Sequence, residues 1–553
     1  MLILLKNGKN ICMNANKLSF KIIPFALALN CFGMLSAAEN TFYFWGDATG
    51  HQKMPNVVDA AAWSTSRSEY VPPSEGTNVN STDANWVIDY EAHLPISMRI
   101  EGYYYNITTP TLNLGSISIV NFNYNNIGSY YDSNNNLVSD GNASAKTNII
   151  SNAENSYWNI GNFTFSGGTS TATVVFGSSR YNTTQAEITL GSVNIGSDGT
   201  TSNILFGGDA SGVCVATMGD NAGKNMTMTE DACMKYLTVN GDFNITGKST
   251  VGLNVWNEDT SVLHSENTPD IVIDGVVRMT PSSAGDLPRL NILNRVSVIS
   301  WSPSKPAPGA THIYAKIGGL DGRGVFTNNS RTLESSTVKL IFTNEVDCEF
   351  SGEFSEKPAD DVTTVMSVKM AGVDGKKQII HADAQFSGTV EVESGALIMK
   401  STTALGKLTM TGGAFGGIDG GVTVSGADWY GGDIILYGAD ALNSGIADKI
   451  TVDGKLSKLG DGPIGVDFNG YEVSSDYIDN EEMFYELLTA TEREGFSDDA
   501  NGDFYAKNLE NCFAKFEWVG DTLTVSFASV PEPAEIGALI GLLTLAIAAR
   551  RKR

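Results

Sequence analysis

Adjacent carboxylates are the residues whose spacing could support acid–base chemistry on a sugar chain. The sequence holds two aspartate pairs, Asp360-Asp361 and Asp498-Asp499. Enzymes that cleave glycosidic bonds use two carboxyl groups that flank the bond. Neither pair lies in an alternating segment, and no histidine, arginine or lysine motif accompanies either one. We therefore interpret both pairs as loop residues and predict no catalytic residue in them.

Histidine and serine motifs give no stronger signal for catalysis. The sequence contains neither G-x-S-x-G nor H-E-x-x-H, the local signatures of a hydrolase nucleophile and of a zinc protease. A serine triad can draw on distant segments, but five histidines have no distinguishing neighbours: His51, His93, His264, His312 and His381. We predict that the protein is not an enzyme, with a polysaccharide lyase or hydrolase as the alternative.

One segment has the alternating oxygen ligands with which a calcium loop begins. Asp499, Asn501 and Asp503 occupy its first positions, and Glu510 stands at the twelfth. The sixth position is Phe504, where the sharp turn of such a loop requires glycine. An acidic, solvated turn is the simpler interpretation, so the sequence predicts no metal and no other cofactor.

Cysteines are too few and too scattered to form a disulfide framework. The part of the chain after residue 38 contains Cys214, Cys233, Cys348 and Cys512, and no C-x-x-C motif occurs. Without that motif, and with only five histidines, no zinc spacing is present. An oxidising compartment would permit a Cys214–Cys233 bond, and buried free thiols are the other interpretation.

Net charge argues against two kinds of partner. The chain carries 36 lysines and arginines against 62 aspartates and glutamates, which gives a net charge of −26. Phosphate binding requires clustered basic side chains, so we predict no nucleic-acid partner. The same charge disfavours docking on an anionic lipid surface. A solvated acidic surface is the expected consequence.

Alternation of apolar and polar residues dominates the body of the chain. A period of two is typical of strands with one buried face. Glycine recurs within the alternation and permits a sharp bend between two short strands. Stacking such coils pairs each strand with its counterpart above and below, so the pattern predicts a β-solenoid. It occurs at residues 112–119, 160–165, 188–195, 237–245, 271–279 and 450–456.

A resemblance to a known family sharpens this prediction. The segment from Phe386 to Phe415 begins Phe-Ser-Gly-Thr-Val-Glu-Val-Glu-Ser-Gly, and it resembles the passenger-associated repeat of autotransporter adhesins. Residues 447–454, 485–488 and 521–525 are similar to later coils of such passengers. The resemblance implies a right-handed parallel β-helix. No series of barrel-length alternating segments follows, so self-export through a β-barrel is not carried over.

Aromatic residues gather near the start of this body. Trp45, Trp63 and Trp86 lie within residues 39–110, and their order resembles the entry segment of β-helical surface proteins. The open end of a solenoid exposes strand edges and core that must be covered. We predict an N-terminal aromatic cap, with stacking of a carbohydrate on these rings as the alternative.

The N-terminal segment has the three parts of a secretory signal peptide. Lys17 and Lys21 precede an apolar run from Ile22 to Leu35, which ends in the small residues 36–38. The run is shorter than the roughly 20 residues of a transmembrane helix. We predict a signal peptide over residues 1–38 and its removal by signal peptidase.

The C-terminal tail is the most specific motif in the chain. Val530-Pro531-Glu532-Pro533 precedes an apolar stretch from Ile536 to Ala549, and Arg550-Arg551-Lys552-Arg553 follows. Basic residues after an apolar helix hold that end on the cytoplasmic side. This order resembles the PEP-CTERM sorting signal of Gram-negative bacteria that make exopolysaccharide. The resemblance implies a short transmembrane helix in the inner membrane, cleavage by an exosortase, and transfer to the outer surface or extracellular matrix.

These features predict an exported, non-catalytic surface or matrix protein with a structural or adhesive role. Extracellular polysaccharide is its candidate partner, and a carbohydrate-binding surface protein is a further alternative. A proline-rich segment at residues 303–308 separates two solenoid regions, and residues 481–491 predict a short helix. The expected order is signal peptide 1–38, cap 39–110, first solenoid 111–301, second solenoid 309–527 and sorting tail 528–553.

Overall fold

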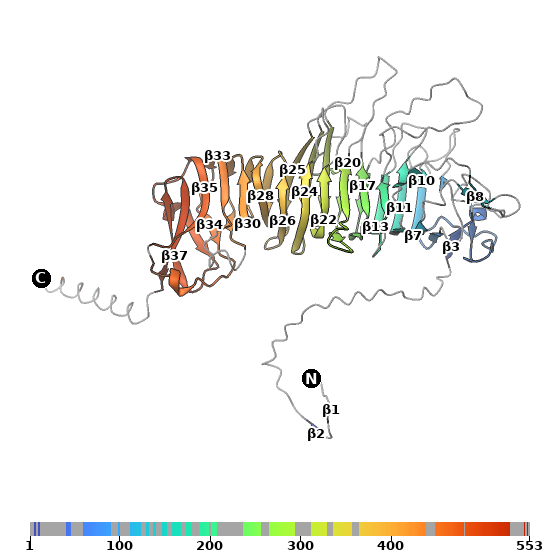
Figure 1. Cartoon of the computed structure of the whole chain (residues 1–553), viewed down its shortest axis with the longest axis horizontal. Coiled ribbons are helices and arrows are strands. Elements are labelled where there is room, and N and C mark those ends of the chain that lie inside the picture. The colour runs from blue at the N-terminus through green and yellow to red at the C-terminus, as the bar shows by residue number, and fades with distance from the viewer. Residues whose placement is uncertain are drawn as a thin grey trace, which may run out of the picture.

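Parallel strands stack along one axis of this all-β protein, in a computed structural model of the chain (Figure 1). Several short strands are described by their backbone alone, among them β10 (Lys146–Ser151) and β12 (Thr173–Ser178). The structure describes backbone and most side chains at residues 40–45, 59–89, 111–122, 157–167, 187–197, 201–206, 236–255, 265–293, 311–328, 336–356, 364–437, 448–480 and 482–530.

Each coil supplies strands to three faces, and strands of the same face pair in parallel. Face A contains β15 (Tyr236–Val239), β18 (Ile271–Ile273) and β21 (Thr311–Ile317). Face B contains β16 (Phe243–Thr246) and β19 (Val277–Thr280). Face C contains β17 (Thr250–Asn254) and β20 (Arg289–Leu293). The chain therefore winds through A, B and C before it returns to A, which confirms the solenoid-like stack.

Bent strands replace separate face B and face C strands in the middle of the stack. The start of β22 (Leu320–Asn328) pairs with β19 on face B, and its end pairs with β20 on face C. Four later strands have the same two-part pairing: β24 (Cys348–Glu356), β26 (Lys377–Gln385), β28 (Ala396–Leu405) and β30 (Ala414–Val424). These bends turn the backbone between two faces without a loop.

Glycines of successive coils lie directly over one another at the corner between faces A and B. A Cβ atom on Gly161 or Gly191 would collide with the carbonyl oxygen of the glycine in the preceding coil. Gly241 and Gly275 continue this column, and the Gly275 N–H donates to the Gly241 oxygen at 3.2 Å. The recurring glycines of the sequence pattern are therefore required because the coils approach too closely for a side chain.

Alternation of the strands fills the interior with apolar side chains. In β11 (Tyr157–Gly167), Trp158, Ile160, Phe163 and Phe165 are buried while the residues between them are more exposed. One continuous hydrophobic cluster runs from the first described coils to the last. Because each coil covers the next, no coil can bury its apolar face alone.

The segment that resembles the autotransporter repeat forms the shortest coils. On face A, Val390 of β27 (Val390–Ser394) pairs with Leu408 of β29 (Leu408–Met410), which pairs with Ala427 of β31 (Ala427–Trp429). No long loop interrupts these coils. In the first part of the chain, longer segments separate the paired strands.

The C-terminal end of the stack departs from parallel pairing. β35 (Tyr485–Glu494) pairs in parallel with β33 (Ile450–Lys458) and antiparallel with β38 (Thr522–Ser529). β38 forms a hairpin with β37 (Cys512–Val519), which completes this end. The helix predicted over residues 481–491 is therefore wrong, because Tyr485, Leu487 and Ala490 point into the core from a strand.

Aromatic residues fill the other end of the stack, where β3 (Thr41–Phe44) pairs with β5 (Asn85–Asp89) and β5 pairs with β7 (Thr111–Phe122). The rings of Trp63 and Trp86 lie 4.4 Å apart between centroids, and both are fully buried. The Trp86 indole donates to the Val79 carbonyl at 2.7 Å. These two rings serve the core, and neither presents a face on which a sugar could stack.

Within the residues that the structure describes, no helix is long and apolar enough to cross a membrane. The expected signal peptide, the proline-rich segment and the apolar stretch of the tail lie outside these residues, apart from a few isolated positions. The parallel ladder continues from β20 to β22 across the proline-rich segment.

Candidate functional site on the flank of the stack

A shallow groove of about 480 Å³ opens on the flank where β22 and β24 bend from face B to face C. Gly322 and Gly352 have positive φ values of 90° and 118°, which a residue with a side chain rarely adopts. A Cβ atom at Gly322 would collide with the Met279 carbonyl, and one at Gly352 would collide with the Gly324 carbonyl. Glycine at these two positions therefore lets neighbouring coils turn together beside the groove.

Polar side chains of successive coils line this flank groove in a row. Arg323 pairs with Ser351 across β22 and β24. Thr280 follows Met279, the residue paired with Gly322, and His381 follows Ile380, the residue paired with Phe350. Parallel strands are about 4.8 Å apart, so the row spans about 14 Å along the stack. The residues that present polar atoms to the groove are Thr280, Asp321, Arg323, Glu349, Ser351 and His381.

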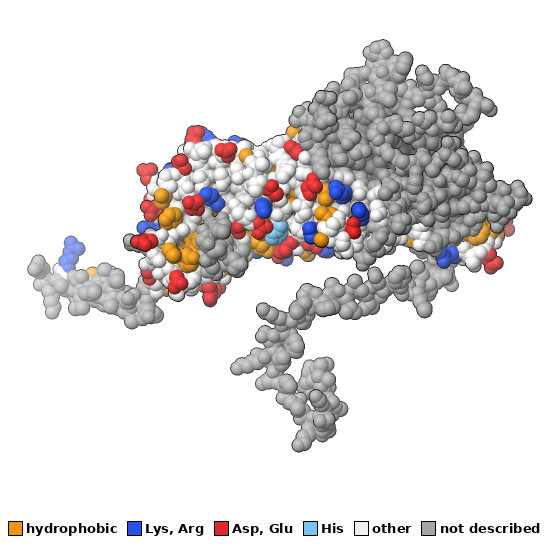
Figure 2. Space-filling view, in the orientation of Figure 1, with side chains coloured by type: hydrophobic (Ala, Val, Ile, Leu, Met, Phe, Trp, Pro, Cys, Tyr) orange, Lys and Arg blue, Asp and Glu red, His pale blue; other side chains and the backbone are white. Residues whose placement is uncertain are grey.

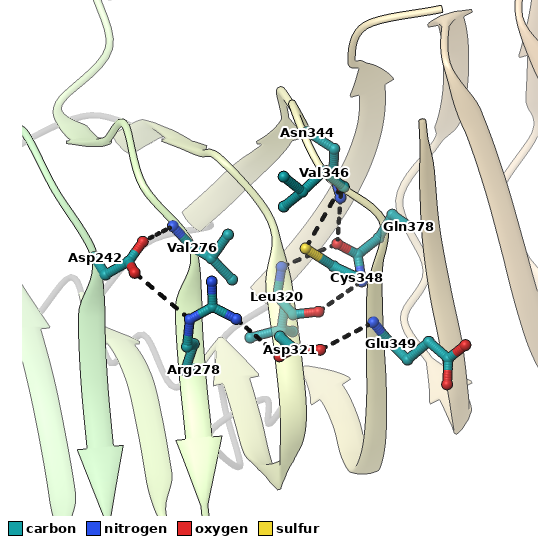
Figure 3. A network of polar contacts seen from close by, with 10 residues as sticks. All are labelled: Asp242, Val276, Arg278, Leu320, Asp321, Asn344, Val346, Cys348, Glu349 and Gln378. Carbon is teal, nitrogen blue, oxygen red and sulfur yellow. Dashed lines mark hydrogen bonds and ion pairs between the residues drawn. The ribbon is translucent and has the colours of Figure 1, made fainter. Parts of the chain in front are cut away.

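An ion-pair chain on face B lies beside the groove (Figure 3). Arg278 contacts Asp242 of the preceding coil at 3.5 Å and Asp321 of the following coil at 3.1 Å. Asp242 also accepts the Val276 N–H, and Asp321 accepts the Glu349 N–H at 3.2 Å. The two aspartates are therefore used to hold coils in register. Arg323, in contrast, is exposed and has no ion-pair partner among the described residues.

A buried amide clamp supports the groove from inside. Gln378 accepts the Leu320 N–H at 2.9 Å and donates to the Leu320 carbonyl at 2.8 Å, across the coil that lies between them (Figure 3). Asn344 donates to the Gln378 side chain at 3.2 Å. Cys348 lies beside this clamp as a free thiol, and burial raises its pKa to about 11. The thiol is therefore protonated at neutral pH and is not a nucleophile.

His381 is held at the end of the groove by an acidic residue from the glycine-rich bulge of β30. Residues 418–421 loop out of the β28–β30 ladder, and Asp419 there has a φ of 52°. Its Oδ2 lies 3.0 Å from His381 Nδ1. A carboxylate only accepts hydrogen bonds, so the hydrogen of this contact is on His381 Nδ1. The other ring nitrogen, Nε2, faces Glu349 at 4.0 Å.

Glu349 is also oriented by a tyrosine. The Tyr437 hydroxyl donates to Glu349 Oε1 at 3.1 Å, and the Lys377 ammonium lies 5.4 Å from the centre of the tyrosine ring. Burial, and then the hydrogen bond to Glu349, raise the pKa of Tyr437 to about 12. Tyr437 therefore remains a hydrogen-bond donor over the physiological pH range and fixes one oxygen of Glu349.

The sequence matches no family model, and no curated protein or solved structure is found to be similar to it. The assignment of a function therefore depends on the residues and geometry of this chain. Figure 2 shows acidic and basic side chains close together over the middle of the stack, between larger white areas. Mixed charge, rather than a patch of one sign, is the property of this flank.

A second polar cluster lies on face A. Glu266, from the segment between β17 and β18, contacts Lys339 at 2.5 Å and Lys369 at 2.6 Å. Lys339 also reaches Glu391, and Lys369 also reaches Glu393. Burial would raise the pKa of Glu266, but hydrogen bonds and attraction from the two lysines outweigh it and lower that pKa. Glu266 thus fastens its segment to coils much later in the chain.

The residues of the calcium-like segment have structural partners. Asp499 caps α2 (Ala500–Asp503) by accepting the Asn501 N–H. Asn501 bonds both the N–H and the carbonyl of Phe516, on the side of β37 that faces away from β38. Asp503 pairs with Lys458 at 2.5 Å and accepts from Ser497. Within the described part of the chain, no cluster of three or more acidic, histidine or cysteine side chains could hold a metal.

The other candidate residues of the sequence fall in different places. Asp360 and Asp361 lie outside the described residues, as do Cys214 and Cys233, whereas Cys512 is buried and free. Val530 is half-exposed at the end of β38. The rest of the sorting motif lies outside the described residues, except for Arg550.

Sequence reasoning missed the flank groove and its residues. His381 and Arg323 had no distinguishing neighbours along the chain, because their partners come from other coils. The available signal was the glycine spacing at Gly322, Gly324 and Gly352 beside polar residues, which marks a bend in neighbouring strands. Without the register of the coils, that spacing does not show which residues become neighbours.

Proposed function

We propose that the chain is an exported, non-catalytic structural or adhesive protein of the cell surface or extracellular matrix. One observation supports this proposal above the others: the coils form a continuous rod (Figure 1). The first strands of the proposed exported part lie at one end of this rod, and its last strands lie at the other end. With about 4.8 Å for each coil, the stack from β7 to β36 (Phe504–Lys507) extends about 60 Å. A right-handed coil is the form that the crossover preference of parallel strands favours.

The sorting tail follows the rod at Val530, at the end opposite β3. In the proposed sequence of events, signal peptidase removes residues 1–38 and the short apolar helix at 536–549 holds the protein in the inner membrane. An exosortase then cuts near Pro531, Glu532 and Pro533. Until that cut, the rod would project away from the membrane, because its free end is the N-terminal aromatic cap.

Cell fractionation tests this proposal. We expect the intact chain on the outer surface or in the matrix, and a chain that lacks residues 531–553 in a different fraction. A control variant keeps the tail but replaces Pro531, Glu532 and Pro533 by alanine; we expect it to remain uncut in the inner membrane. If both variants are distributed as the intact chain is, the tail does not sort the protein and the proposal is wrong.

A polysaccharide lyase or hydrolase is the second candidate, favoured by one observation. The flank groove brings Glu349 near His381, and such a pair could serve as acid and base. Against it, the groove is open to solvent and the Asp321 carboxylate is already bound by Arg278 and by a backbone N–H. Incubation of the purified protein with polysaccharides, followed by measurement of new reducing or unsaturated chain ends, separates the two candidates.

A further inference from the structure

We propose that the flank groove binds a neutral, hydroxyl-rich polysaccharide chain laid along the rod. This inference rests on the proposed function, because such a chain meets the protein outside the cell. It names the partner class and assigns the residues that hold it: Thr280, Arg323, Glu349, Ser351 and His381.

The shape of the groove suits an extended polymer. It is shallow and open, and its polar row crosses successive coils rather than converging on one point. A span of about 14 Å along the rod accommodates a few linked sugar rings. A small ligand would need an enclosed pocket that buries most of its surface.

The mixture of donors and acceptors selects hydroxyl groups. Arg323 only donates hydrogen bonds, and the Glu349 carboxylate only accepts them. His381 has its Nδ1 bound by Asp419 and its Nε2 4.0 Å from Glu349, so Nε2 is the ring nitrogen that lies beside this acceptor. A hydroxyl group both donates and accepts, so one sugar can satisfy neighbours of both kinds. An anionic ligand would meet Glu349 and Asp321, and a cation would meet the free guanidinium of Arg323.

Among the described residues that line the groove, none presents an exposed aromatic ring. Phe350, which lies under the groove, is fully buried. Affinity must therefore come from hydrogen bonds, each of which contributes modestly to binding in water. Removal of the Arg323 guanidinium, which can bond two hydroxyls at once, should weaken binding about tenfold.

A glycan array probed with the purified full-length protein tests this inference. The array carries neutral hexasaccharides of glucose, mannose, galactose and xylose, and hexasaccharides of uronic acids. The variants are Arg323→Ala and, as the matched control, Arg289→Ala, which removes an exposed arginine outside the groove and changes the net charge equally. We expect binding to neutral members, about tenfold weaker for Arg323→Ala and within twofold of the wild type for Arg289→Ala.

Three results would overturn the inference: no neutral member bound, a preference for the uronic acids, or equal affinities of the two arginine variants. If Arg323→Ala fails to fold, Glu349→Gln replaces it, since the glutamine oxygen still accepts the hydrogen bond of the Tyr437 hydroxyl. Unchanged binding of neutral hexasaccharides by Glu349→Gln would also overturn the inference. The array does not depend on sorting, and fractionation does not depend on the groove. Failure of one inference is therefore distinct from failure of the other.

Discussion

Replacing Gly275 by alanine tests whether close stacking of the coils determines the glycine column. A Cβ atom at this position would lie 2.5 Å from both the carbonyl carbon and the carbonyl oxygen of Gly241, and 2.6 Å from the Asp242 nitrogen. All three are backbone atoms of the preceding coil, so no side chain can rotate away. Since a carbon and an oxygen normally approach no closer than about 3.3 Å, the coils must separate locally by about 0.8 Å.

The expected destabilisation follows from the hydrogen bonds at this corner. The Gly275 N–H donates to Gly241 at 3.2 Å, and the Phe243 N–H donates to the Val276 carbonyl at 3.0 Å. The Val276 N–H donates to the Asp242 side chain at 2.9 Å. A separation of this size weakens all three, and each contributes about 1 kcal/mol. We expect Gly275→Ala to lower the free energy of unfolding by about 3 kcal/mol, within the range for overpacked sites.

Urea denaturation followed by circular dichroism measures this effect. The control is Gly285→Ala, ten residues away in the chain: a Cβ atom there meets nothing within 4 Å, and its φ is not positive. We expect the control to differ from the wild type by less than about 0.5 kcal/mol. If Gly275→Ala is as stable as the control, the coils are not held as closely as we argue, and the steric account of the column fails.

Three further substitutions test the charged groups. Glu266→Gln should lower the free energy of unfolding by about 1 kcal/mol at neutral pH, since the two ion pairs of Glu266 are partly exposed. Because the pKa of Glu266 is lowered in the folded state, this difference in unfolding free energy should vanish as the pH falls below about 4.5 in urea titrations. Burial, opposed by a bond from Gly420, raises the pKa of Asp448 from 3.8 to about 6. Its protonated carboxyl therefore stabilises the folded state below pH 3.8, and this contribution is lost as the pH rises through about 6. We expect Asp448→Asn to stabilise the protein at pH 7 by up to about 3 kcal/mol. The free energy of unfolding of this variant should depend less on pH between 3.8 and 6 than that of the wild type. Lys458→Met leaves the buried Asp503 without its cation and should lower the free energy of unfolding by about 3 kcal/mol in the same assay. The double variant with Asp503→Asn should recover part of this loss of stability, because the unpaired buried charge is then removed.

The sequence carries enough information to predict the stack but not the register of its coils. Alternation and recurring glycine predicted the strands and the corners at Gly161, Gly191 and Gly241, because both signals are local and repeat in each coil. Gly454 resembled these glycines but lies at another corner, between faces C and A. The sequence pattern alone does not tell which corner a glycine occupies.

The predicted helix at residues 481–491 shows the limit of local propensity. Tyr-Glu-Leu-Leu-Thr-Ala-Thr-Glu contains good helix formers, and a helix could also gather Tyr485 and Leu488 on one side. The strand is formed because β33 offers an unpaired edge on one side and β38 on the other. Pairing on both edges outweighs propensities of a few tenths of a kcal/mol for each residue.

The residues of the flank groove become neighbours only through the register of the coils. For this reason the sequence alone does not predict the groove, whereas the folded structure indicates its ligand class. Thr280, Arg323, Ser351 and His381 are scattered along the sequence, and only the register of four coils makes them neighbours. Once aligned, they offer donors and acceptors with little net charge, on a protein whose total charge is −26. A polyanion would have to approach against that repulsion. A neutral chain does not experience this repulsion, and this is why we propose a neutral polysaccharide as the ligand of the groove.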